Sequence, residues 1–170
     1  MAIRMTQEDW LIDYIESAFA GVSLGDGIDL YAAQSMDHYG CPEEDALSRT
    51  AERIDWRRVP AEDLSPRFWA ITFLDAKGFR FYAPAIMTAI VRGSDQTGLL
   101  LDFFIWSLDT SPHGTLKDVP LRELFSQQQT AAIVRFLKYL IHNASDRKEV
   151  SDEERCLSAI QRHRERPRRD

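Results

Sequence analysis

The chain has 170 residues, 44% of them hydrophobic and 11% aromatic, which is enough to bury the core of one domain. Its 21 basic and 27 acidic side chains give a net charge of −6, which argues against binding of nucleic acid by phosphate attraction. No apolar run reaches the ~18 residues of a membrane-spanning segment, and the N-terminal sequence MAIRMTQEDW has acids where a signal peptide needs apolar residues. We therefore expect a cytoplasmic protein that does not bind membranes.

The charge is unevenly distributed along the chain. Residues 144–170 contain eight basic and seven acidic side chains, so residues 1–143 carry a net charge of −7. We expect residues 1–143 to form one globular domain and residues 144–170 to form a charged C-terminal helix or tail. An electrostatic protein partner of this domain should be basic.

The cysteines and histidines predict neither a disulfide framework nor a metal site. Cys41 and Cys156 lie far apart and outside any Cys-x-x-Cys spacing. The four histidines lack the spacing of three or four residues that places two ligands on one helix face. No nucleotide-binding or hydrolase signature is present either, so we expect no metal and no cofactor.

Three helices are predicted in the first third of the chain. Residues 6–20 place apolar side chains on one face, and Thr6 and Asp9 have the spacing of a capping box. Residues 28–39 fit a second helix. A third is predicted around residues 43–57, because a proline suits its first turn and the acids that follow favour its N-terminus.

An antiparallel β-hairpin is predicted over residues 68–82. Residues 68–74 and 79–82 are rich in aromatic and β-branched side chains, as strands are. Between them, Asp75 suits a type I turn and Gly78 suits the left-handed position of a bulged hairpin. The expected fold class is therefore α+β: a mostly helical single domain with a small antiparallel β-hairpin packed on helices.

The rest of the chain predicts further helices. Residues 85–91 are short and apolar, and residues 99–108 fit a buried strand about as well as a buried helix; we favour a helix or irregular packing. Ser126 and Gln129 have capping-box spacing at the start of a strongly amphipathic segment. A last helix is expected to begin near Ser151.

Two pairs of residues suggest catalysis, and both have a simpler structural interpretation. Asp75 and Lys77 have the D-x-K spacing of restriction-type nucleases, but the glycine that follows and the predicted second strand favour a turn. Cys41 and His38 could form a nucleophile and its base, but no third group is evident to orient them. We therefore favour structural roles for all four.

Arg80 is the most suggestive single residue. In the predicted strand it lies between two phenylalanines and shares the opposite face with Tyr82. A covered guanidinium needs a carboxylate partner, for which Asp37 and Asp55 are candidates. Structural ion pairing is favoured over ligand binding, because covered charges are normally paired.

Several segments together resemble an uncharacterised bacterial domain family of unknown function. They are F-L-D-A-K-G-F-R-F-Y-A-P-A at residues 73–85, I-D-W at 54–56, D-H-Y at 37–39 and the helix S-Q-Q-Q-T-A-A-I-V-R-F-L-K-Y-L at 126–140. The resemblance covers about residues 10–143. It implies a small bacterial cytoplasmic protein and supplies no activity, cofactor or catalytic residue.

The leading functional prediction is a protein-binding domain without catalysis, such as an immunity or antitoxin-like protein that neutralises a basic toxin. Small size, the acidic domain and the missing enzyme signatures favour it, since complementary charge speeds association. The residues expected at the binding surface are acids, with two tyrosines as aromatic anchors: Asp26, Asp29, Asp37, Glu43, Glu44, Asp45, Tyr31 and Tyr39.

The alternative is a small-molecule enzyme or sensor with a pocket near the predicted hairpin. In this pocket Arg80 would bind an anionic group. The residues expected to converge there are Asp37, Tyr39, Asp75, Arg80 and Tyr82. A nucleic-acid module that uses the arginine-rich tail ranks last, because the rest of the chain is negative, and the sequence leaves the oligomeric state open.

Overall fold

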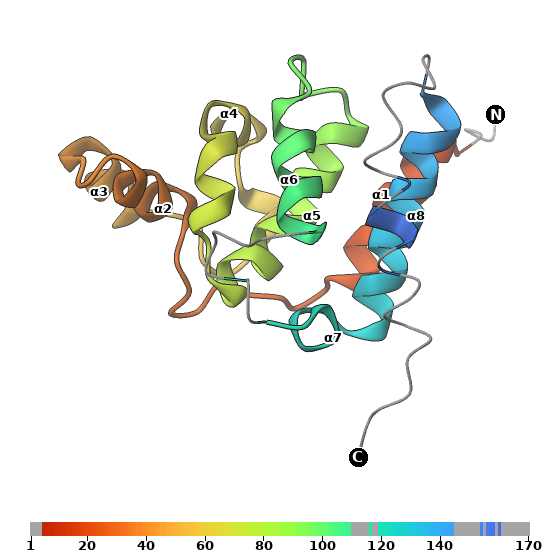
Figure 1. The fold of residues 1–170 in the computed structure, drawn as a ribbon, viewed down its shortest axis with the longest axis horizontal. Helices are drawn as coiled ribbons and strands as arrows, with labels where there is room; N and C mark the ends of the chain where they lie inside the picture. The colour runs from red at the N-terminus through yellow and green to blue at the C-terminus, as the bar shows by residue number, and fades with distance from the viewer. Residues whose placement is uncertain are drawn as a thin grey trace. The chain divides into compact units, whose positions relative to one another are not determined.

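The computed structural model describes residues 5–109, 116, 119–144, 154, 156–158 and 160. Every regular element in this part of the chain is a helix, so the predicted α+β class is wrong and the fold is all-α (Figure 1). The elements are α1 (Gln7–Ala18), α2 (Leu30–Asp37), α3 (Pro42–Ser48), the 3₁₀ helix η1 (Trp56–Arg58), α4 (Ala61–Leu64), the 3₁₀ segment η2 (Ser65–Phe73), α5 (Ala76–Val91), α6 (Leu99–Asp109), α7 (Leu121–Leu124) and α8 (Gln127–Asn143).

The chain divides into two compact units. Unit 1 combines Met1–Phe19 with Pro120–Asp170, and unit 2 is Ala20–Val119. Unit 2 contains nine basic and fifteen acidic residues, a net charge of −6, whereas unit 1 contains twelve of each. The acidity of the protein therefore resides in unit 2. The expected domain boundary near residue 143 stays a prediction.

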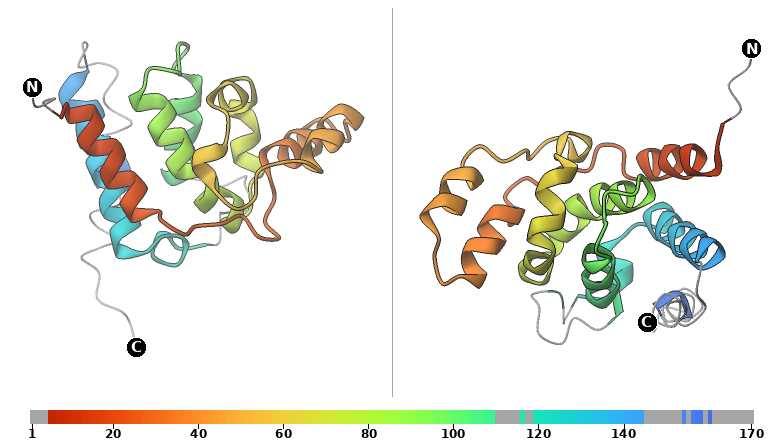
Figure 2. Two further views of the ribbon diagram at one scale, coloured as in Figure 1. Left: turned by 180° about the vertical axis from the view of Figure 1, so that it is seen from behind. Right: turned by 90° about the horizontal axis from the view of Figure 1, so that it is seen from above.

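Unit 1 is built on the antiparallel pair α1 and α8, which lie side by side in Figures 1 and 2. Both predicted capping boxes are confirmed, with Thr6 before α1 and Ser126 before α8. Each helix turns one apolar face inward, and the ring of Phe19 meets that of Phe125 edge to face at 6.1 Å. The periodicity of the sequence was sufficient here because each helix is half exposed.

Unit 2 is centred on α5, which is buried along most of its length. Its buried residues run without a break from Phe81 to Ala89, through Pro84. The ring of Phe79 stacks on that of Phe104 in α6 at 5.7 Å. Between Phe81 and Ala89 this helix has no exposed polar face, so its sequence there shows no alternation of polar and apolar residues that would mark a helix.

This burial explains the error at the predicted hairpin. Asp75 is the N-cap of α5, and its Oδ1 accepts the backbone N–H of Gly78 at 2.7 Å. The expected first arm is the segment η2, and the expected second arm is the first turns of α5. A buried helix that is rich in aromatic residues has the amino-acid composition typical of a strand. The hairpin was predicted from that composition, and the prediction was therefore wrong.

Gly78 is required for close approach rather than for a left-handed turn. A Cβ built on it would overlap the carbonyl oxygen of Ile28, and a Cβ on Gly27 would lie 2.7 Å from the Cβ of Lys77. The loop before α2 therefore packs directly on the first turn of α5. The N–H of Ile28 adds a hydrogen bond of 3.1 Å to Asp75 Oδ1.

The remaining predictions fared differently. Residues 99–108 are helical, as favoured, and lie within α6. The expected third helix over residues 43–57 is wrong in length, since α3 ends at Ser48 and a loop leads to η1. The cap expected at Ser151 lies outside the described residues.

Within the described ranges, no helix has the length and apolar character needed to cross a membrane.

Candidate functional site

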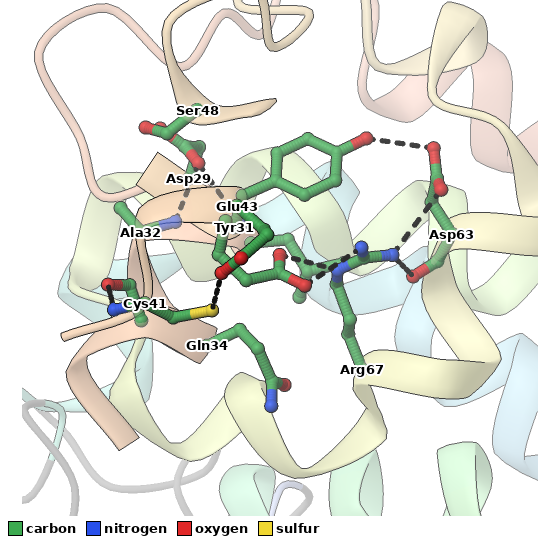
Figure 3. Close-up of polar contacts among 12 residues, drawn as sticks. Asp29, Tyr31, Ala32, Gln34, Cys41, Glu43, Ser48, Asp63 and Arg67 are labelled. Carbon is green, nitrogen blue, oxygen red and sulfur yellow. Dashed lines mark hydrogen bonds and ion pairs between the residues drawn. The ribbon is translucent and has the colours of Figure 1, made fainter. Parts of the chain in front are cut away.

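A group of polar contacts in unit 2 lies around α2 and α3, beginning with Asp29. This residue is only 2% exposed, so the prediction that it lies at a binding surface is wrong. Its Oδ1 caps α2 by accepting the N–H groups of Tyr31 at 3.1 Å and Ala32 at 2.9 Å (Figure 3). Its Oδ2 accepts the hydroxyl of Ser48 at 2.7 Å, so one carboxylate fastens α3 to the start of α2.

Arg53 completes the environment of Asp29. Its Nη1 lies 2.9 Å from Asp29 Oδ2, and its other nitrogens donate to the carbonyl oxygens of Gly25 at 3.0 Å and Gly27 at 2.7 Å. One guanidinium thus compensates a buried carboxylate and fixes the loop before α2. Asp29 and Arg53 form a structural pair.

A second cluster, which we call the Arg67 cluster, consists of Tyr31, Glu44, Asp63 and Arg67. The Arg67 guanidinium donates to both carboxylate oxygens of Glu44, at 3.0 and 3.1 Å, and lies 3.4 Å from Asp63 Oδ1. The hydroxyl of Tyr31 donates to Asp63 Oδ2 at 2.8 Å, and the guanidinium lies 4.7 Å from the centre of the Tyr31 ring (Figure 3). The cluster joins α2, α3, α4 and η2.

The pKa values of Tyr31 and Arg67 are shifted in the direction that keeps both groups protonated as hydrogen-bond donors in the cluster. Burial and the hydrogen bond to Asp63 raise the pKa of the Tyr31 hydroxyl, which therefore stays protonated as a donor. Burial alone would lower the pKa of Arg67, but the hydrogen bond and charge of Glu44, together with Asp63, raise it. Glu44, predicted to face a partner, is committed to Arg67.

The surface next to the Arg67 cluster is formed by residues 36–45, here called the 36–45 segment. Tyr39 is fully exposed and has a φ of 57°, the left-handed conformation that bulky residues avoid. It ends α2 in a Schellman arrangement, with its own N–H bonded to the carbonyl of Met36 and that of Gly40 to Ser35. Glycine normally occupies this position.

The charged side chains of the 36–45 segment are acidic. Glu43 and Asp45 are exposed, and Asp37 is half-buried. The pKa of Glu43 is lowered by a hydrogen bond from its backbone and by the Cys41 thiol, whose Sγ lies 3.3 Å from the carboxylate. Met36, which precedes Asp37 in the sequence, is 49% exposed, so the segment combines negative charge with apolar area.

The pair Cys41 and His38 is not arranged as a nucleophile and base in direct contact. The Cys41 thiol donates to Glu43, and His38 Nε2 lies 3.0 Å from the amide nitrogen of Gln34. The D-x-K residues are also separated in function, because Asp75 caps α5 and Lys77 pairs with Asp26. Within the described part of the chain, no three His, Cys, Asp or Glu side chains form a group that could hold a metal ion.

The other predicted residues lie in different places. Asp26 is exposed, and the hydrogen bond from Lys77 lowers its pKa. Tyr82 is buried, its hydroxyl accepts the N–H of Leu30 at 3.2 Å, and burial raises its pKa to about 12. Arg80 lies in α5, half-buried, rather than in a strand. Asp75 and Tyr82 thus both hold the start of α2.

The sequence reasoning missed the residues that organise this region: Ser48, Arg53, Asp63 and Arg67. Apart from the contact between Asp63 and Arg67, which are four residues apart, their partners lie nineteen to thirty-two residues away along the chain, and no local pattern encodes such pairs. One signal was available. Asp29 follows a glycine-rich turn and precedes an apolar run, which is the position of an N-cap.

Comparison with known proteins gives a family and no function. No curated protein and no solved structure matches the chain. One family model, described as a family of unknown function, matches residues 7–162. This match confirms the resemblance inferred from the sequence and reaches beyond residue 143, into the charged C-terminal region. The chain belongs to this family of unknown function, DUF6714.

Proposed function

We propose that the chain is a non-catalytic protein that binds a basic protein partner through the 36–45 segment. The observation that carries the proposal is Tyr39. Its left-handed backbone costs about 1–2 kcal/mol, and its exposed ring returns no packing energy to the fold. Tyrosine is among the residues that dominate binding energy in interfaces, so a partner supplies the contact that the isolated chain lacks.

Charge supports a basic partner. The acids Asp37, Glu43 and Asp45 lie on both sides of Tyr39 in the sequence, within the unit that carries a net charge of −6. A negative surface around an aromatic anchor attracts a positive one over a distance and speeds encounter. The exposed side chain of Met36 would enlarge the apolar centre of such an interface.

The finer form of the proposal is an immunity or antitoxin-like role, in which the chain covers and neutralises a basic toxin. A small acidic protein whose charged surface needs only to cover its target suits this role. The alternative of an anion-binding pocket near Arg80 is less favoured. Asp75 and Tyr82 are engaged with backbone N–H groups at residues 28 and 30, whereas Asp37 and Tyr39 lie at the other end of α2.

The experiment isolates the partner and then tests the segment. The tagged chain is used to capture binders from its host, and the partner that remains in stoichiometric complex is purified for affinity measurements at increasing salt. We expect a basic partner whose Kd rises with ionic strength. The triple variant D37N/E43Q/D45N should weaken binding by at least tenfold, because three complementary charges are removed.

Glu62→Gln is the matched control, because Glu62 is an exposed acid in α4 of the same unit. Equal affinity of the triple variant and the control would exclude the 36–45 segment as the interface. The immunity role requires in addition that the partner arrests growth when expressed alone and that co-expression of the chain restores it. A partner that is harmless alone would refute that role and leave the binding role standing.

A further inference from the structure

Unit 1 contains a pocket of about 420 Å³ between α1 and α8 that is unrelated to the 36–45 segment. Its volume lies in the range of small-molecule sites, which hold about 300–1,000 Å³. The lining residues are Gln7, Trp10 and Leu11 of α1 with Arg135, Lys138, Tyr139 and His142 of α8. On each helix these positions recur at intervals of three and four residues, so they share one face.

The two walls of the pocket are joined by contacts that two of its lining residues, Arg135 and Tyr139, make with α1. The hydroxyl of Tyr139 donates to Glu8 at 3.1 Å, and the guanidinium of Arg135 lies 4.3 Å from the centre of the Tyr14 ring. The capping boxes fix the N-termini of both helices. The pocket is therefore lined by rigid helices rather than by loops.

The pocket gathers basic side chains that have no carboxylate partner among the described residues. Arg135, Lys138 and His142 are exposed, and no ion pair joins any of them to a described acid. The carboxylate of Glu8 accepts the hydroxyl of Tyr139, another lining residue. Two permanent positive charges and one histidine thus face the same space and favour an anion.

The opposite wall supplies an aromatic surface. Trp10 is 46% exposed, and its ring meets that of Tyr14 at 5.6 Å. An exposed indole beside cationic side chains can stack on a planar ring while the cations bind the charged group attached to that ring. Gln7 adds an amide that can donate or accept at the end of the pocket.

We propose that the α1–α8 pocket binds a small aromatic anion, with its ring on Trp10 and its carboxylate or phosphate group at Arg135 and Lys138. The shared chemistry is a planar ring that carries one anionic oxygen group. Glu8 lies at the border of the pocket and disfavours ligands whose negative charge extends across both walls. The proposed ligand is independent of the protein partner of unit 2.

The test titrates the full-length protein with benzoate and with phenyl phosphate and follows the indole N–H signals by NMR, with Trp10→Phe identifying the signal of Trp10. Phenol and inorganic phosphate are the comparison probes, because each lacks one half of the proposed ligand. We expect saturable shifts of the Trp10 signal with at least one of the two aromatic anions. The one that binds tighter identifies the anionic group.

Lys138→Gln should weaken this binding about tenfold, the effect of losing one charge-assisted hydrogen bond. Arg122→Gln is the matched control, since it removes an exposed positive charge of unit 1 that does not line the pocket. Its affinity should equal that of the unaltered chain. The proposal is overturned if neither aromatic anion gives a saturable shift, if both variants bind equally, or if phenol or inorganic phosphate binds as tightly as the aromatic anions.

Discussion

The two units use their basic side chains in opposite ways. In unit 2, Arg53, Arg57, Arg67 and Lys77 each pair with a carboxylate; the Arg67 pair joins η2 to α3, and the Arg53 pair holds a loop on the start of α2. In unit 1, the exposed basic side chains Arg135, Lys138 and His142 of α8 form no ion pair with a described carboxylate and line a pocket instead. The contrast separates cations that stabilise the fold from cations that are available to a ligand. It also predicts where a substitution changes stability and where it changes binding.

Removal of Asp29 should have the largest effect. Asp29→Ala deletes a buried helix cap and leaves Arg53 and Ser48 without their acceptor, so we expect a loss of about 3 kcal/mol in the free energy of unfolding. Urea denaturation measures it. The exposed acid Asp45 serves as the matched control, and Asp45→Ala should change stability by less than about 0.5 kcal/mol. Similar losses in both variants would refute the structural role of the Asp29 and Arg53 pair.

Arg67 tests whether geometry or charge alone holds the cluster. Arg67→Lys keeps the positive charge but loses the fork that contacts both oxygens of Glu44, so we expect a loss of about 2 kcal/mol by urea denaturation. A double-mutant cycle with Glu44→Gln gives the coupling between the two side chains. A coupling near zero would show that the contact contributes nothing and would return Glu44 to the set of acids available to a partner.

The two units also differ in how well their helices could be predicted from the sequence. In α1 and α8 the caps and the apolar period are local and each helix has one solvent-exposed face, so both helices and their N-terminal caps could be predicted. The central part of α5 has no solvent-exposed face. Because of this, the aromatic residues around Asp75 and Gly78 were interpreted as a hairpin. Only a neighbouring loop, packed within contact of Gly78, explains why a glycine stands in that helix.

The candidate site shows the same limit at the level of side chains. The exposure of Glu43 could be expected from its place near a helix end. Tyr39 was also a candidate for the inward face of the helix predicted over residues 28–39, and that prediction is wrong because Tyr39 is fully exposed. The role of both residues in binding stays a prediction. The burial of Asp29 could not be expected, because it depends on an ion pair with Arg53, which lies in a loop twenty-four residues further along the chain. Pairs between residues so far apart in the sequence depend on the fold, and the fold class predicted from the sequence was wrong.

Tyr39 offers a test in which stability and binding move in opposite directions. Tyr39→Gly relieves the left-handed strain and should stabilise the protein by about 1 kcal/mol, seen as a higher Tm. The same variant removes the proposed aromatic anchor and should weaken partner binding. Met36→Ala is a useful comparison, because it removes exposed apolar area without changing the backbone. A destabilised Tyr39→Gly variant would show that the ring contributes to the fold and would remove the main argument for the interface.

Substitution of Lys138 should give the smallest change in stability. Comparing it with a substitution of Arg53 tests directly whether the basic side chains of the two units have different roles. Its side chain is exposed and makes no ion pair with a described residue, so Lys138→Gln should leave the free energy of unfolding within about 0.5 kcal/mol of its original value. Arg53→Gln, which also removes one positive charge, should destabilise the protein strongly because it uncovers Asp29. A loss for Lys138→Gln as large as that expected for Arg53→Gln in urea denaturation would mean that Lys138 has a structural role. A silent Lys138→Gln variant that is folded like the original chain makes the ligand titration of the α1–α8 pocket interpretable, because any loss of affinity then comes from the missing charge and not from a loss of stability.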